Sequence, residues 1–158
     1  MKKIISLALI LTFTTITFGQ TSAENLWIGK YHHENDIGKE YFMLEIFRDG
    51  NKLKGRYKET VTAQTSNKFT LNITVKGNIA SFFVDECLPF TKAEEDEGDI
   101  NGCGSRADGF QLGALILKAK RVTKGKEISF KALGGTLVDA GFAGELNFVK
   151  TKKFYYSF

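Results

Sequence analysis

The sequence contains little proline, histidine or cysteine: one, two and two of its 158 residues respectively. With 42% hydrophobic and 25% charged residues it has the composition of a globular domain, which excludes collagen-like and disordered proteins. It also lacks a large excess of one charge, because the formal net charge is only +4. Nucleic acid is therefore not an expected partner, and the length fits a single domain.

The one long apolar run lies at the N-terminus. Lys2 and Lys3 precede residues 4–18, which are apolar except for hydroxyl residues, and small or polar residues follow. This pattern is typical of a secretory signal peptide, and the run is shorter than the roughly 20 apolar residues of a spanning helix. We expect residues 1–20 to be removed, with cleavage as late as residue 23. The expected product is a monomer of the periplasm or extracellular space that does not span the membrane.

Apolar and polar residues alternate through most of the remaining chain. In the clearest segment, Phe69, Leu71, Ile73 and Val75 are separated by polar residues. A period of two places successive side chains on opposite faces of a β-strand. The pattern predicts eight strands, over residues 27–34, 41–48, 52–63, 68–76, 79–86, 114–123, 127–133 and 145–152. Little helix is expected, because glycine or β-branched residues interrupt every longer window.

Short glycine-containing connectors separate several of these segments. Asp49-Gly50-Asn51, Gly77-Asn78 and Lys124-Gly125-Lys126 suit tight turns between antiparallel neighbours. Eight such strands are best stabilised when the sheet closes on itself, since closure removes exposed edges. The predicted fold class is therefore all-β, an eight-stranded antiparallel up-and-down barrel over residues 24–158, with a two-sheet β-sandwich as the alternative.

Large aromatic side chains are candidates for the barrel interior. An eight-stranded barrel is wide enough to be filled by side chains or to hold one small ligand. Rings of the number and size found here would leave a cramped cavity. The candidate interior, ligand-binding residues are Trp27, Tyr31, Phe42, Phe69, Phe83 and Phe130, with Phe148 as a further ring.

The first predicted strand opens with Trp27-Ile28-Gly29-Lys30-Tyr31. A tryptophan with a nearby glycine at this place resembles the start of calycin barrels, the group that includes lipocalins and fatty-acid-binding proteins. The resemblance covers the architecture and the first strand. It implies a small apolar ligand in the barrel, or inhibition of an enzyme through inserted loops.

The alternation stops between residues 88 and 113, where a long acidic loop is expected. Cys87 and Cys103 bracket most of it. Thiols of exported proteins tend to oxidise, so a disulfide between these two cysteines is predicted, with two unpaired cysteines as the alternative. In the chain-entropy model a disulfide that closes a loop of this length contributes about 3 kcal/mol.

The acidic residues of this loop allow two interpretations. Alternating oxygen-bearing side chains before Gly102 approximate a calcium-binding loop, whose candidate ligands are Glu97, Asp99, Asn101 and Asp108. Alternatively, the carboxylates dock on a cationic protein partner through the candidate residues Glu94, Glu95, Asp96 and Glu97. Calcium is the only cofactor that the sequence suggests.

No motif for catalysis is present. The sequence has no nucleophile elbow, phosphate-binding loop, H-E-x-x-H or C-x-x-C motif. His32 and His33 are adjacent on a predicted strand, so their side chains point to opposite faces and do not share a metal. We therefore expect a non-enzymatic exported binding protein that takes a small apolar ligand in the barrel or a protein partner through the loop. The alternatives are an inhibitor of a cationic enzyme and a calcium-stabilised structural domain.

Overall fold

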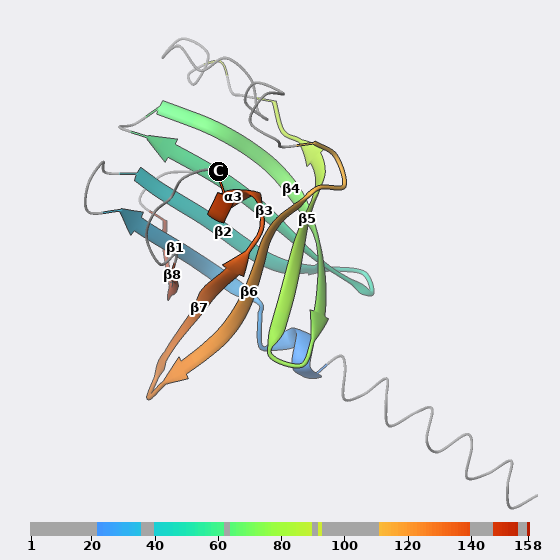
Figure 1. Cartoon of the computed structure of the whole chain (residues 1–158), viewed down its shortest axis with the longest axis vertical. Coiled ribbons are helices and arrows are strands. Elements are labelled where there is room, and N and C mark those ends of the chain that lie inside the picture. The colour runs from blue at the N-terminus through green and yellow to red at the C-terminus, as the bar shows by residue number, and fades with distance from the viewer. Residues whose placement is uncertain are drawn as a thin grey trace, which may run out of the picture.

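The computed structural model describes residues 22–35, 40–61, 64–89, 92, 111–139, 147–154 and 158. Eight antiparallel strands form one closed barrel in which each strand pairs with its neighbours in sequence and β8 closes on β1 (Figure 1). The predicted all-β up-and-down barrel is confirmed, and the single closed sheet excludes the sandwich. In chain order the elements are β1 (Gly29–Asn35), β2 (Glu40–Asp49), β3 (Lys52–Val61), β4 (Gln64–Lys76), β5 (Ile79–Cys87), β6 (Leu115–Lys124), β7 (Glu127–Gly134), α3 (Thr136–Asp139) and β8 (Asn147–Thr151).

Tight turns gather at one end of the barrel. Asp49 pairs with Lys52, and Lys76 with Ile79, so two residues connect the strands of each of these hairpins. Gly77 has a φ of +63°, a conformation that glycine adopts without steric cost. The predicted turns are confirmed. We call this end the turn end, and the opposite end, where the β1–β2, β3–β4, β5–β6 and β7–β8 connections lie, the loop end.

The strand boundaries lie close to those predicted, and two short helical segments are additions. The largest strand difference is at β4, which begins at Gln64 rather than at residue 68. A helical turn over 22–25 precedes β1, and α3 follows β7. Neither segment spans three turns, so neither carries the apolar periodicity by which longer helices are recognised.

Aromatic rings fill the barrel from the turn end to its centre. The side chains of Trp27, Tyr31, Phe82, Phe130 and Phe148, which we call the ring cluster, are each 0% exposed. Phe130 lies at its centre, with its ring centroid 4.0 Å from that of Tyr31 and 5.0 Å from that of Trp27. Because Trp27 precedes β1 at the turn end, its indole closes that end of the interior.

Phe83 is not an interior residue, and that prediction is wrong. On β5 the buried positions are Ala80, Phe82 and Val84, whereas Phe83 is half-buried on the outer face. Adjacent phenylalanines make the two faces look equally apolar at this point. The polar residues Ser81 and Asp85 share the face of Phe83, and they are the sequence signal that identifies it as the outer one.

Tyr31 links the ring cluster to the backbone at the turn end. Its hydroxyl donates a hydrogen bond to the carbonyl oxygen of Trp27 at 3.0 Å. Burial raises the pKa of Tyr31 to about 12, and the nearby Arg121 guanidinium opposes part of this rise. The folded barrel therefore favours the neutral phenol.

We expect the stability of the barrel to fall at high pH because of Tyr31. An unfolded tyrosine ionises near pH 10, so below this pH the hydroxyl is neutral in both states and contributes no pH dependence. Between pH 10 and about 12 only the unfolded chain releases the proton, which lowers the free energy of unfolding by about 1.4 kcal/mol per pH unit. Urea titrations at several pH values measure this slope. Tyr31→Phe should flatten it, and identical slopes for the variant and the parent chain would contradict the assignment.

Several predictions fall on residues outside the described ranges. These are the signal peptide over 1–20, Cys103 and all the candidate residues of the acidic loop, namely Glu94, Glu95, Asp96, Glu97, Asp99, Asn101 and Asp108. Within the described ranges no helix is both long enough and apolar enough to span a membrane.

Candidate functional site

Four interior positions form one row across the wall at the loop end. His33 on β1 pairs with Phe42 on β2, Phe42 pairs with Glu59 on β3, and Glu59 pairs with Asn67 on β4. Directly paired residues of an antiparallel sheet project to the same face. We call His33, Phe42, Glu59 and Asn67 the loop-end row.

A buried carboxylate and a buried amide meet in this row. The exposed fractions of Glu59 and Asn67 are 8% and 6%. Asn67 Nδ2 donates a hydrogen bond to Glu59 Oε2 at 2.5 Å. The other polar atom of the amide, Asn67 Oδ1, is buried and has no hydrogen-bond partner in the part of the chain that the structure describes. A buried acceptor without a donor carries the full cost of its lost hydration, typically about 1–3 kcal/mol.

His33 adds a half-buried ring to the same row. Its imidazole stacks on Phe42, with the centroids 5.8 Å apart, and lies 6.1 Å from the ring of Phe148. The Nδ1 atom is 3.0 Å from the carbonyl oxygen of Asn147 on β8. Since a carbonyl oxygen only accepts, Nδ1 carries a hydrogen in this contact.

Aromatic rings form the floor beneath the loop-end row. Tyr57 and Phe69 lie one step deeper on β3 and β4 and stack with their centroids 4.8 Å apart. The ring of Phe42 lies 6.2 Å from that of Tyr57, so the apolar surface is continuous from the floor to the row. This end of the interior thus combines aromatic walls with acceptor atoms.

Five of the six predicted interior residues lie where they were expected. Trp27, Tyr31, Phe42, Phe69 and Phe130 all face the interior and are at most 1% exposed. A role of these rings in ligand binding stays a prediction. Within the described part of the chain, no group of three or more histidine, cysteine, aspartate or glutamate residues could hold a metal ion.

Glu59 and Asn67 were not among the predicted site residues, although a signal for both exists. The alternation of Leu53, Gly55 and Tyr57 reaches Glu59 when it is extended by one step. Extending the alternation of Phe69 and Leu71 backward by one step reaches Asn67. A polar residue on an apolar face was the signal that the prediction overlooked.

His32 and His33 point to opposite faces, as predicted. His33 faces the interior with Phe42, while His32 pairs with Met43 on the outer face. The two cysteines of the predicted disulfide are not both described. Cys87 ends β5 at the loop end and is exposed, whereas Cys103 lies outside the described residues, so their pairing stays a prediction.

Comparison with known proteins leaves the function open. The chain matches no protein-family model, no curated protein sequence and no solved structure. Its closed barrel of eight antiparallel strands is consistent with a calycin-like architecture. Because one fold supports many functions, the function depends on the residues of the site.

Proposed function

We propose that this protein is a non-enzymatic binding protein that takes a small, largely apolar molecule into the loop end of the barrel. The observation that carries the proposal is the buried pair of Glu59 and Asn67 among aromatic rings. The ligand places an apolar body against Phe42, Tyr57 and Phe69. It places a cationic or hydrogen-bond-donating group against Glu59 and Asn67.

The hydrogen-bond acceptors of Glu59 and Asn67 favour a ligand that donates hydrogen bonds. A carboxylate accepts hydrogen bonds only, and Asn67 Oδ1 is an acceptor that no donor among the described residues reaches. A buried acceptor without a donor carries the cost of its lost hydration, and a donating ligand would remove this cost. An ammonium or amidinium group would supply charge and donors together, whereas an anionic ligand would be repelled.

The packing of the interior supports access from the loop end. Trp27 closes the turn end, and its indole packs on Phe130 and Phe82. At the loop end, the row lies above the aromatic floor. A ligand would therefore enter from the loop end and stop at the floor.

We propose further that the protein is exported and belongs with calycin-like barrels. The basic residues and apolar run of the N-terminus support export, and the Trp27–Tyr31 segment with the closed barrel supports the kinship. The predicted Cys87–Cys103 disulfide belongs to this proposal. It is supported by Cys87, which is not a free thiol.

Protein binding through the acidic residues is a second proposal for the same end. The segment that carries Glu94–Glu97 leaves the barrel after Cys87 and returns before β6, so it is attached at the loop end. Serine or glutamine substitutions of these four acids should abolish binding of a cationic protein while leaving small-molecule binding unchanged. Loss of both activities would place the acidic residues in the ligand site instead.

Titration with paired probes tests the small-molecule proposal. The probes are 2-phenylethylamine, which is a cation at pH 7, the neutral 2-phenylethanol and the anion phenylacetate. Heteronuclear NMR of the mature chain should show saturable shifts of β3 and β4 amides that are largest for the amine. Glu59→Gln keeps the shape of the side chain and removes its charge, so it should weaken amine binding by about 10-fold or more, as expected for a hydrogen bond to a charged group.

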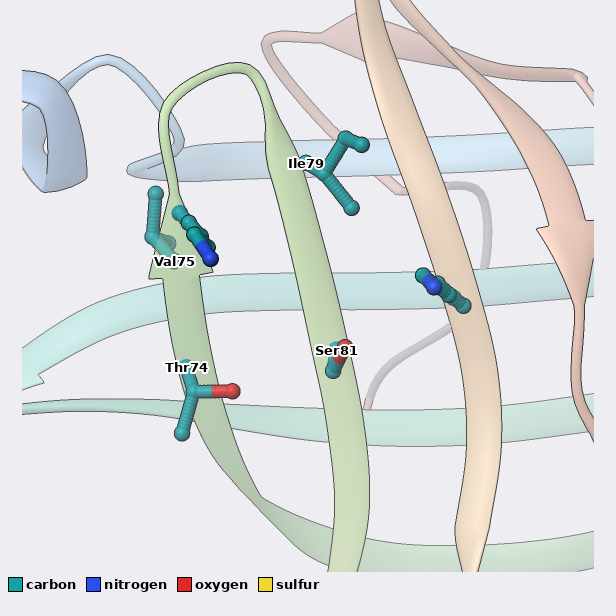
Figure 2. A pocket seen from close by; sticks show the side chains of 6 residues that line it. Thr74, Val75, Ile79 and Ser81 are labelled. Carbon is teal, nitrogen blue, oxygen red and sulfur yellow. The ribbon is translucent and has the colours of Figure 1, made fainter.

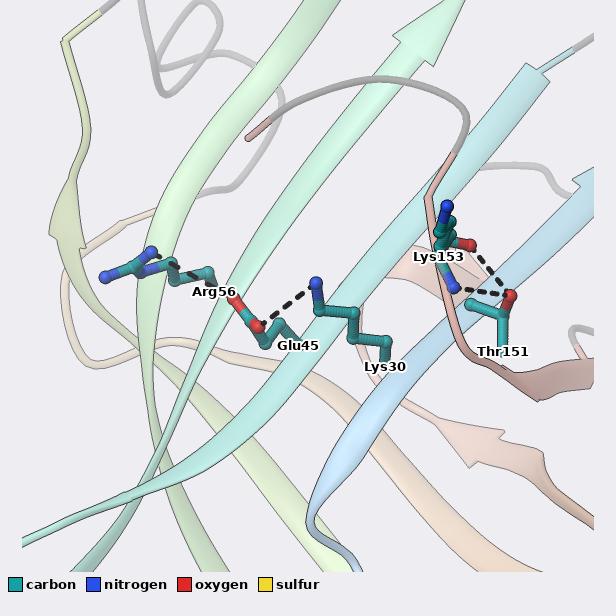
Figure 3. Close-up of polar contacts among 5 residues, drawn as sticks. All are labelled: Lys30, Glu45, Arg56, Thr151 and Lys153. Atoms are coloured by element: carbon teal, nitrogen blue, oxygen red, sulfur yellow. Dashed lines mark hydrogen bonds and ion pairs between the residues drawn. The ribbon is translucent and has the colours of Figure 1, made fainter.

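Glu45→Gln is the matched control. Glu45 lies on the outer face of β2, where its carboxylate contacts Lys30 and Arg56 (Figure 3). The same loss of charge at this position should leave amine affinity unchanged. Equal weakening by the two variants would reduce the effect to net charge, and the absence of saturable binding by all three probes would overturn the proposed function.

A further inference from the structure

A hollow on the outer wall of the barrel lies away from the loop end. It has a volume of about 320 Å³ and lies over β4, β5 and β6. Thr74 on β4 lies beside Ser81 on β5, and Ile79 lies nearer the turn end of β5 (Figure 2). Val75 also borders the hollow, but its side chain packs against the core. The remaining lining residues are Lys76 and Lys118.

Strand register brings these groups together. Thr74 pairs with Ser81, and Ser81 pairs with Lys118, so two hydroxyls and one ammonium share a row across three strands. Lys76 pairs with Ile79 in the next row toward the turn end. Lys76 and Lys118 are both exposed. The hollow is therefore held by the hydrogen-bonded sheet rather than by a connecting loop.

The polar side chains that line the hollow suit an anion. Two of them are ammonium groups and two are hydroxyls, which donate hydrogen bonds readily, and none of the six lining residues is acidic. The carboxylates of Asp85 and Glu86 lie toward the other end of β5, near the loop end. Hydrogen bonds from ammonium groups to oxyanions are stronger and shorter than those between neutral groups.

Some cations elsewhere on the outer wall have a carboxylate partner, in contrast. There Glu45 lies between Lys30 and Arg56, at 3.9 and 4.0 Å (Figure 3). Farther along the outer face Lys54 contacts Asp85 at 2.6 Å, and this hydrogen bond lowers the pKa of the Asp85 carboxyl. Lys30, Arg56 and Lys54 thus each have a carboxylate of this chain as a partner.

Among the described residues, the lysines of the hollow have no such carboxylate partner. Neither Lys76 nor Lys118 forms an ion pair with an acid in the described part of the chain. Exposed Lys120 extends the positive charge, because it pairs with Ile79 on one side and with Lys131 on the other. The positive potential of this face is therefore available to a bound anion.

We propose that this hollow binds the oxyanion group of a phosphate or sulfate ester. Lys76 and Lys118 pair with its charged oxygens, and the hydroxyls of Thr74 and Ser81 complete the hydrogen bonding. Ile79 contacts the carbon-bearing part of the ester. The site lies on the outer wall, so it is independent of the ligand proposed for the interior.

Three anions at constant ionic strength test the site on the mature chain. Inorganic phosphate, inorganic sulfate and phenyl phosphate are each titrated against chloride, with amide chemical shifts as the readout. Saturable shifts over residues 74–81 and 118 are expected. Tighter binding of phenyl phosphate would identify an ester as the ligand, and equal affinity of phenyl and inorganic phosphate would identify the free oxyanion. Absence of saturation with all three would overturn the proposal.

Two double variants separate a built site from bulk charge. K76Q/K118Q should weaken phosphate binding at least 10-fold. K124Q/K126Q removes the same charge at the exposed β6–β7 turn and should change the affinity less than 2-fold. Equal weakening by the two double variants would mean that only net charge attracts the anion, and would overturn the assignment of the hollow.

Discussion

Replacing Phe130 with alanine is expected to lower the free energy of unfolding by about 3–5 kcal/mol. The ring is 0% exposed and contacts four other rings of the ring cluster. Besides Trp27 and Tyr31, these are Phe82 and Phe148, whose centroids lie 6.4 and 6.1 Å from that of Phe130. Truncation would leave a cavity inside a closed sheet, where hydrogen-bonded neighbours on both sides prevent the wall from collapsing into it.

Phe83→Ala is the control for this prediction. It removes a ring of the same size, but from a half-buried position on the outer face, so a loss of only about 1 kcal/mol is expected. Urea unfolding followed by circular dichroism measures both values, and linear extrapolation compares them in water. If Phe83→Ala cost as much as Phe130→Ala, the inward and outward faces of β5 would have to be exchanged.

The barrel could be predicted because the same sequence signals, apolar–polar alternation and short turn motifs, recur along the chain. The alternation around Phe69, Leu71 and Ile73 indicates which face of a strand is apolar. Turns such as Gly77-Asn78 predict that neighbouring strands pair antiparallel. Eight such signals agree, so an error of a few residues in one strand leaves the topology unchanged. At Phe82-Phe83 the apolar signal is equal on both faces, and there the predicted face was wrong.

The candidate site was harder to predict because alternation indicates which face of the sheet a side chain projects from, but not which residue of the neighbouring strand it contacts. Glu59 and Asn67 are eight residues apart, and their contact depends on the β3–β4 register, which shifts between Glu59 and Thr60. A β-bulge of this kind has no clear sequence signature here. Likewise, no spacing along the chain indicates that Thr74, Ser81 and Lys118 share one row.

Each of the two proposed sites includes a residue of β4. Asn67 projects inward near the loop end, whereas Thr74 projects outward near the turn end, at opposite ends of the same strand. Variants at one site should therefore leave the other unaffected, since well-separated substitutions act additively. Loss of phenylethylamine binding in K76Q/K118Q would show that the sites are coupled.

Gly135→Ala is expected to lower the free energy of unfolding by about 2–5 kcal/mol, through backbone strain and overpacking together. Gly135 joins β7 to α3 with a φ of +113°, a conformation that residues with a side chain rarely adopt. A Cβ atom there would lie 2.5 Å from the carbonyl oxygen of Ile116 and 2.8 Å from the amide nitrogen of Leu117. Both are backbone atoms of β6, so relief of the clash would displace the strand or α3, whose Leu137 is part of the core.

Gly125→Ala separates the clash from the conformational cost. Gly125 has a φ of +62° in the β6–β7 turn, and nothing lies within 4 Å of the added carbon. Only the conformational penalty of about 1–2 kcal/mol is expected. Heat denaturation compares the two variants, because 1 kcal/mol shifts the Tm of a chain of this size by roughly 2–4 °C. Equal melting temperatures would mean that Ile116 gives way without cost, and that α3 is not held tightly against β6.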